Sequence, residues 1–343
     1  MKKILVTGGA GFIGANFILK QIYETENKIL NYDSLTYAAN LSTLNDIQSH
    51  EKYEFIKGDI TDVDLLWNTI SEFMPDFIVN FAAESHVDKS IDGPMDFIKT
   101  NILGTAILLE SIRKYLSRNL QLKNSFKYLH ISTDEVYGSL GQDGYFIEES
   151  PYDPSSPYSA SKASSDHLVR AWNKTYNLPI LITNCSNNYG PYQFPEKLIP
   201  VIILNCLNEN NIPLYGDGKN IRDWLFVEDH CDAIYSVLKN GNIGDTFNIG
   251  GNNEIQNIHI VKMICKIMDE LKPRSNGEKY SKLITFVKDR PGHDYRYAID
   301  SSKIKQQLNW EPKENFNSGI RKTIKWYINN ENWWKKNQNN STD

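Results

Sequence analysis

The chain has 343 residues, which at roughly 150 residues per domain allows about two domains and a hydrophobic core of ordinary size. Its 40% hydrophobic and 23% charged residues are typical of globular proteins and exclude a disordered chain, and no apolar run is long enough to cross a bilayer. The formal net charge of -5 excludes a broad basic surface for nucleic acid, so an anionic ligand must meet locally placed cations.

Apolar, β-rich runs alternate with longer segments of helical period through the first half of the chain. Strands are expected at residues 2–8, 28–34, 54–59, 76–83 and 126–132, and helices at residues 12–24, 64–73 and 94–115. Several of these strands are continuous apolar runs, as expected of strands buried on both faces. The pattern predicts an α/β fold with a doubly wound parallel sheet, the Rossmann architecture.

The composition changes after residue 187, where loops rich in Pro, Gly, Asn and aromatic residues begin. We therefore expect an NAD-binding Rossmann domain over residues 1–187 and a smaller, mostly substrate-binding domain over residues 188–330. The segment 244–251 again resembles a core strand that ends in glycine. This predicts a return of the chain to the first sheet near residues 230–256, so that the two domains are interleaved.

Three glycines follow the first predicted strand and precede a helix. Gly8, Gly11 and Gly14 are three residues apart, the spacing that gives a tight turn and brings the backbone and the helix N-terminus close to a pyrophosphate. Asp33 ends the next strand, where a carboxylate accepts hydrogen bonds from a ribose diol and repels a 2′-phosphate, which favours NAD over NADP. The alternative is that these glycines only form turns in an α/β domain that binds no dinucleotide. Further cofactor contacts are expected at Asp59, Ala82 and Ala83.

Tyr158 and Lys162 are four residues apart and share one face of a predicted helix. An ammonium group beside a phenol lowers the pKa of the tyrosine and makes it a better general base. Thr133 follows the strand at 126–132, at the sheet edge where α/β folds bind ligands. Together they predict oxidation of a carbinol by NAD. By itself the Tyr/Lys spacing also fits an ordinary surface helix.

Two carboxylates, Asp134 and Glu135, come directly after Thr133. A simple dehydrogenase does not need them, but elimination of water beside a new ketone needs one group that removes an α-proton and another that protonates the leaving hydroxyl. The alternative is a pair of solvated acids in a turn.

Seven stretches resemble the dTDP-glucose 4,6-dehydratase family of extended short-chain dehydrogenases/reductases. They are TGGAGFIG, NFAAESHVDKSI, HISTDEVYG, YSASKASSDHLVRAW, NNYGPYQFPEKLIP, LYGDGKNIRDWLFVEDH and DRPGHDYRYAID. The resemblance implies conversion of dTDP-glucose to dTDP-4-keto-6-deoxyglucose. It implies that Tyr158 takes the C4 hydroxyl proton, that Glu135 removes the C5 proton and that Asp134 protonates the C6 hydroxyl, while NAD accepts a hydride from C4 and returns it to C6.

The resemblance also implies the ligand contacts. Those to NAD are Phe12, Ile13, Asp33, Ser34, Leu35, Thr36, Asp59, Ile60, Thr100, Tyr158, Lys162 and Asn188. Those to the nucleotide sugar are Ser85, Thr133, Asn187, Lys197, Leu198, Pro213, Tyr215, Arg222, Asn257, Arg290 and His293. Lys197, Arg222 and Arg290 are the local cations that a diphosphate requires, although isolated surface arginines usually form only salt bridges.

Other functions remain open at this stage. The nearest alternatives are a related epimerase or a dehydratase acting on a UDP- or CDP-sugar, and the third is a catalytically inactive NAD-binding scaffold. Apolar stripes on residues 94–115 and on the Tyr158 helix fit either a core or, as the resemblance implies, a homodimer interface.

The remaining sequence features restrict the partners and the location. The seven histidines form no metal-binding pattern, so we expect no metal. The four cysteines form no CxxC pair and fit inert thiols in a reducing compartment. We therefore expect a cytoplasmic protein with no nucleic-acid or membrane partner.

Overall fold

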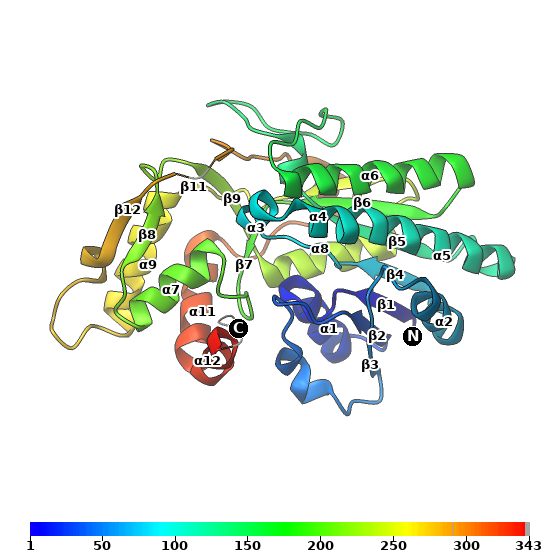
Figure 1. Cartoon of the computed structure of the whole chain (residues 1–343), viewed down its shortest axis with the longest axis horizontal. Helices are drawn as coiled ribbons and strands as arrows, with labels where there is room; N and C mark the ends of the chain where they lie inside the picture. The colour runs from blue at the N-terminus through cyan, green and yellow to red at the C-terminus, as the bar shows by residue number, and fades with distance from the viewer. Residues whose placement is uncertain (290, 340–343) are drawn as a thin grey trace.

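The computed structural model describes residues 1–289 and 291–339, so the predicted contact residue Arg290 lies outside the described residues. Figure 1 shows a broad layered part built around one large sheet and a smaller part formed mainly by later segments of the chain. None of the described helices has the length and apolar character needed to cross a membrane. All four cysteines are buried thiols without a disulfide bond.

The large sheet has seven parallel strands in the order β10-β6-β5-β4-β1-β2-β3. Its strands are β1 (Lys3–Thr7), β2 (Lys28–Asp33), β3 (Tyr53–Lys57), β4 (Phe77–Asn80), β5 (Lys127–Thr133), β6 (Ile180–Cys185) and β10 (Thr246–Ile249). Most of their side chains are buried, as the continuous apolar runs predicted. The strand order reverses between β1 and β4, and such a switch point is where doubly wound sheets bind ligands.

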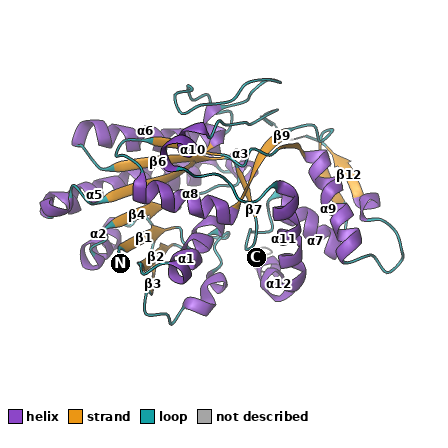
Figure 2. Ribbon diagram, turned by 180° about the vertical axis from the view of Figure 1, so that it is seen from behind, coloured by secondary structure: helices purple, strands orange, loops and turns teal. Residues whose placement is uncertain are grey.

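Helices cover both faces of this sheet (Figure 2). They are α1 (Phe12–Glu24), α2 (Val63–Phe73), α3 (Val87–Asp92), α4 (Pro94–Phe97), α5 (Thr105–Arg118), α6 (Pro157–Tyr176), α8 (Val227–Asn240) and α10 (Ser302–Leu308). Apolar residues of α1 and α8 form one core with the sheet, and those of α2, α5 and α6 form another on its opposite face. The predicted doubly wound α/β fold is therefore confirmed.

The predicted helix over residues 94–115 is interrupted by a π-helical segment, η2 (Ile98–Gly104). A Cβ atom at Gly104 would lie 2.6 Å from the side chain of Ile60, so glycine allows a close approach there. Helical periodicity alone does not distinguish a π turn from an α turn. The four short 3₁₀ segments are η1 (Leu41–Ile47), η3 (Leu120–Leu122), η4 (Asp134–Tyr137) and η5 (Tyr280–Leu283).

The smaller part has its own apolar core. Its strands are β7 (Asn187–Tyr189), β8 (Ile212–Tyr215), β9 (Ile221–Phe226), β11 (Glu254–Gln256) and β12 (Ile284–Val287), and its helices are α7 (Leu198–Leu207), α9 (Asn257–Leu271), α11 (Phe316–Asn329) and α12 (Glu331–Asn339). Between β9 and β11 the chain returns to the large sheet, where β10 pairs with β6. The domain boundary at residue 187 stays a prediction.

Candidate active site

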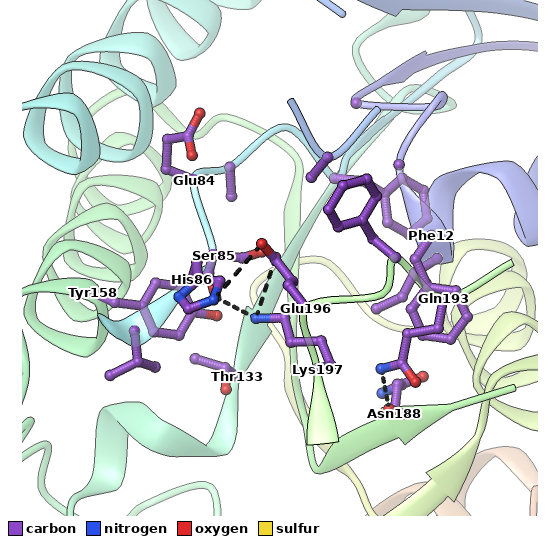
Figure 3. A pocket seen from close by; sticks show the side chains of 18 of the residues that line it. Phe12, Glu84, Ser85, His86, Thr133, Tyr158, Asn188, Gln193, Glu196 and Lys197 are labelled. Carbon is purple, nitrogen blue, oxygen red and sulfur yellow. Dashed lines mark hydrogen bonds and ion pairs between the residues drawn. The ribbon is translucent and has the colours of Figure 1, made fainter. Parts of the chain in front are cut away.

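One cavity of about 510 Å³ lies along the carboxyl ends of β1, β2, β4 and β5 and reaches the smaller part of the molecule. Every site residue predicted from the sequence lines it, apart from Leu35, Asp134 and the undescribed Arg290. Figure 3 shows Thr133 and Tyr158 on one side of this cavity and Phe12, Gln193 and Asn188 on another. The structure therefore brings together residues that are more than 200 positions apart in the sequence.

The glycine turn has the close contacts that a dinucleotide cradle requires. Gly8 has a φ of +73°, and a Cβ atom added there would lie 2.5 Å from the backbone nitrogen of Ala82. A Cβ atom at Gly14 would lie 2.5 Å from the carbonyl oxygen of Gly8. Gly11 precedes α1 without a side-chain cap, so the first N–H groups of the helix are not occupied by a capping side chain. A pyrophosphate fits such a helix N-terminus.

Asp33 supports the same turn from the end of β2. Its two carboxylate oxygens accept hydrogen bonds from the backbone N–H groups of Ala10 at 2.8 Å and Leu35 at 2.7 Å. Burial raises the pKa of Asp33, while these two hydrogen bonds act in the opposite direction. Leu35 itself adopts a left-handed backbone conformation, with a φ of 58°, and does not line the cavity.

Tyr158 and Lys162 both line the cavity from α6, as their spacing predicted. The Nζ atom of Lys162 donates a hydrogen bond to the carbonyl oxygen of Ile131 at 2.7 Å. Burial and the nearby Glu135 raise the pKa of Tyr158 well above its ordinary value, whereas a hydrogen bond with Thr133 lowers it. Desolvation of the phenol therefore outweighs the lowering of the tyrosine pKa that its spacing from Lys162 predicts.

Asp134 is not a solvated turn acid, since only 1% of it is exposed. It begins η4, and its Oδ1 atom accepts a hydrogen bond from Thr133 at 3.3 Å. Its Oδ2 atom has no hydrogen-bond partner among the described residues. Burial, followed by the charge of Glu135, raises the pKa of Asp134 well above its ordinary value. Asp134 therefore does not line the cavity, and its burial favours the protonated form of its carboxyl group, while Glu135 does line the cavity.

Arg222 enters the cavity from β9 and is 5% exposed, so it is not an ordinary surface arginine. Its guanidinium group donates to the carbonyl oxygens of Ile221 at 2.7 Å and Asp294 at 2.9 Å and lies 4.3 Å from the ring centre of Tyr297. Lys197 immediately precedes α7, and its Nζ atom donates to the carbonyl oxygen of Ser85 at 2.8 Å. Both cations are thus held at the cavity by backbone acceptors.

Several lining residues were missed by the sequence interpretation. The Glu196 carboxylate lies 3.7 Å from the Nε2 atom of His86 and 4.0 Å from the Nζ atom of Lys197. Figure 3 shows these three side chains close together. The only signal for it was the adjacent Glu-Lys pair before a helix. Tyr297 was missed because it lies 75 positions after Arg222, whose guanidinium group it contacts in the fold. No group of metal-binding side chains occurs within residues 1–289 and 291–339.

Comparison with known proteins identifies the family. Residues 5–323 match the family model described as GDP-mannose 4,6 dehydratase. The chain is 56% identical to a dTDP-glucose 4,6-dehydratase of Escherichia coli, over 97% of this chain and 96% of that protein. It is 48% identical to the structure of the Bacillus anthracis dTDP-glucose 4,6-dehydratase in complex with NAD, with a TM-score of 0.87 and coverage of 98% and 100%.

A third relative is DesIV, the dTDP-glucose 4,6-dehydratase of Streptomyces venezuelae with NAD and TYD bound. It is 40% identical, has a TM-score of 0.89 and covers 98% of this chain and 99% of its own. These matches extend over nearly the whole of each protein. The chain therefore belongs to the dTDP-glucose 4,6-dehydratase family within the extended short-chain dehydrogenases/reductases.

Proposed function

We propose that this chain is an NAD-dependent hydro-lyase that converts dTDP-glucose to dTDP-4-keto-6-deoxyglucose and water. One observation carries the proposal: Thr133, Asp134 and Glu135 are consecutive at the end of β5, beside Tyr158 and Lys162. The residues proposed for oxidation and those proposed for elimination therefore lie together at the end of β5. Asp134, whose burial raises its pKa and so favours a carboxyl group that can give a proton, distinguishes the site from that of an enzyme that only oxidises and reduces C4.

The residues around the glycine turn fit NAD. The N–H groups at the start of α1 face the position of a pyrophosphate, and Asp33 retains lone pairs for a ribose hydroxyl beside its two backbone hydrogen bonds. Bound NAD would accept a hydride from C4, return it to C6 and place a positive charge near the phenol of Tyr158. We assign the cofactor to residues 1–187 together with the return segment 230–256.

Oxidation requires a base for the proton of the C4 hydroxyl. Tyr158 is that base in our proposal, and the Thr133 hydroxyl shares the hydrogen bond of the substrate hydroxyl. Lys162 contributes a positive charge that stabilises the phenolate. The proton of the C4 hydroxyl therefore moves to Tyr158.

Elimination requires a second base and an acid. Glu135 takes the C5 proton, which is acidic beside the new ketone, and the neutral Asp134 gives a proton to the C6 hydroxyl, so that water leaves. Glu135 later returns a proton to C5. Tyr158 releases the proton it took from the C4 hydroxyl to solvent, and Asp134 takes up a proton from solvent in place of the one it gave to the leaving water. The protons therefore balance over one cycle.

We assign the nucleotide sugar to the residues contributed mainly by 188–330. Lys197 and Arg222 line the cavity on this side and supply positive charge for a diphosphate. The contacts proposed for Ser85, Asn187, Leu198, Pro213, Tyr215, Asn257 and His293 are consistent with their positions in the cavity lining.

The function is tested by incubating the purified chain and NAD with dTDP-glucose, UDP-glucose and CDP-glucose in parallel. We expect a 4-keto-6-deoxy product from dTDP-glucose. The preference for thymine over uracil should be about 10- to 200-fold, because one methyl group in an apolar pocket contributes about 1–3 kcal/mol. Unchanged dTDP-glucose, or dTDP-galactose without a keto sugar, would refute the proposal, and faster turnover of another nucleotide sugar would support the alternative dehydratase.

We further propose a homodimer formed through α4, η2 and α6. Met95, Ile98 and Leu103 are exposed along one stretch of the chain, and Leu168 and Trp172 of α6 are only partly buried. Light scattering should give the mass of a dimer for the wild type and that of a monomer for Leu103→Glu. Val63→Glu, at an exposed apolar position on α2, is the matched control and should stay dimeric. A monomeric wild type would contradict this interface.

We also propose that the chain resides in the cytoplasm. Its four buried, unpaired cysteines are consistent with a reducing compartment. Cell fractionation that recovered it elsewhere would contradict this assignment.

A further inference from the structure

Asp166 is a completely buried carboxylate that the proposed reaction does not use. It lies on α6, four residues after Lys162, and is 0% exposed. Its Oδ2 atom accepts hydrogen bonds from the Ser132 hydroxyl at 2.8 Å and the Tyr152 hydroxyl at 2.9 Å. Its Oδ1 atom has no hydrogen-bond partner within the part of the chain that the structure describes. Burying such a group is costly unless a positive charge compensates it.

The compensating charge comes from the same helix. Lys162 and Arg170 are four residues before and after Asp166, so the three side chains share one face of α6. Lys162 is itself only 4% exposed. Burial lowers the pKa of Lys162, and the charge of Asp166 acts in the opposite direction. Burial raises the pKa of Asp166, and the charges of Lys162 and Arg170 together with the hydrogen bonds from Ser132 and Tyr152 favour its ionised form. An isolated lysine at this depth would tend to lose its proton.

The other groups around the carboxylate carry no compensating positive charge. The Nε2 atom of His130, on β5, lies 3.4 Å from the Oδ1 atom of Asp166, but burial and the charges of Lys162 and Arg170 lower the pKa of this histidine well below its ordinary value, which disfavours its charged form. Tyr152 and Tyr137 face the carboxylate from the preceding segment and from η4, and burial raises the pKa of both phenols. Cys185 faces Lys162 from β6, and burial likewise raises the pKa of its thiol.

The same carboxylate is connected to the reacting end of β5. Its donor Ser132 directly precedes Thr133, and Lys162 donates to the carbonyl oxygen of Ile131 at 2.7 Å. The side-chain amide of Asn184 donates to the carbonyl oxygen of Thr133 at 3.1 Å and lies 3.4 Å from the Oδ2 atom of Asp166. A substitution of Asp166 would therefore disturb both the end of β5 and the surroundings of Lys162.

We propose that Asp166 is a positioning residue that keeps Lys162 protonated inside the cavity wall and holds it against the end of β5. Asp166 does not line the cavity, so it acts through Lys162 and Ser132 and not on the substrate. The importance of this charge for turnover rests on the proposed function. The protonation state of Lys162 can be measured without any substrate.

The pH dependence of acetylation of Lys162 by acetic anhydride, followed by mass spectrometry of its peptide, reports the loss of its proton. In Asp166→Asn the midpoint should lie about 1–3 pH units below that of the wild type, the effect of removing a neighbouring opposite charge. Asp166→Glu keeps the charge and should restore most of the shift. Tyr152→Phe removes a hydrogen bond to the same carboxylate but keeps the charge, so its midpoint should remain near that of the wild type. Equal midpoints in the wild type and Asp166→Asn would overturn the proposal.

The acetylation midpoint of the wild-type protein can by itself overturn the proposed role of Asp166. A midpoint on the acid side of neutrality would mean that Lys162 is uncharged despite Asp166, and this result does not depend on whether Asp166→Asn folds. With dTDP-glucose, the alkaline limb of the kcat profile of Asp166→Asn should move to lower pH together with the acetylation midpoint. If the midpoint shifts while the wild type forms no 4-keto sugar, the proposed function fails and the role of Asp166 stands.

Discussion

Replacing Asp134 by Asn should slow the loss of water by roughly 100-fold or more, as expected for removal of a general acid, and should leave oxidation at C4 nearly unchanged. Asp134 is buried, its pKa is raised, and its Oδ1 atom accepts from Thr133. Asparagine has almost the same shape and can still accept that hydrogen bond, but it has no proton to give. Reduced nicotinamide should therefore accumulate, which rapid-mixing absorbance measures alongside product formation.

Asp153→Asn is the matched control for this experiment. Asp153 is an exposed carboxylate close to the same segment, where its backbone N–H donates to the carbonyl oxygen of Val136 at 3.1 Å. Its replacement should change neither step. An equal decrease of oxidation and water loss in Asp134→Asn would remove the acid role and indicate a general disturbance of the strand end.

The fold could be predicted closely from the sequence because its main signals are local. Buried parallel strands require continuous apolar runs, and the glycine turn after β1 requires residues without a Cβ atom at fixed spacing. The α/β pattern also placed the ends of β1, β2 and β5 at one edge, and this edge is where the cavity lies. The π-helical segment before α5 was not foreseen, because an apolar helical period does not distinguish it from an α-helix.

The site was predictable only in part, since its charges depend on burial and on contacts across the fold. The spacing of Tyr158 and Lys162 correctly indicated a shared helix face, but it did not reveal that Lys162 binds the carbonyl oxygen of Ile131. The Asp134-Glu135 pair suggested an acid and a base, and the burial of Asp134, which the sequence did not reveal, raises its pKa in the direction that an acid requires. For Glu196 the sequence offered only its position beside Lys197 before a helix, and its place in the cavity lining became visible in the fold.

Replacing Tyr158 by Phe should reduce overall turnover by roughly 100- to 10,000-fold, because the C4 hydroxyl then has no base during oxidation. Elimination must follow oxidation, so both steps should be suppressed. No reduced nicotinamide should accumulate, in contrast to Asp134→Asn. The two variants therefore differ in the absorbance transient even where their steady-state rates are similar, and the same rapid-mixing experiment separates them.

Tyr137→Phe controls for the loss of a buried tyrosine hydroxyl near the site. The Tyr137 hydroxyl donates to the Oδ1 atom of Asn248 at 2.9 Å, and its side chain does not line the cavity. This variant should lose about 1–3 kcal/mol of unfolding free energy, because it leaves a buried acceptor unpaired, and it should keep most of its activity. If Tyr158→Phe retained full turnover while Tyr137→Phe behaved as expected, another group would be the base. Glu135 would then be the first to test, because it lines the same cavity and is among the charges that raise the pKa of Tyr158.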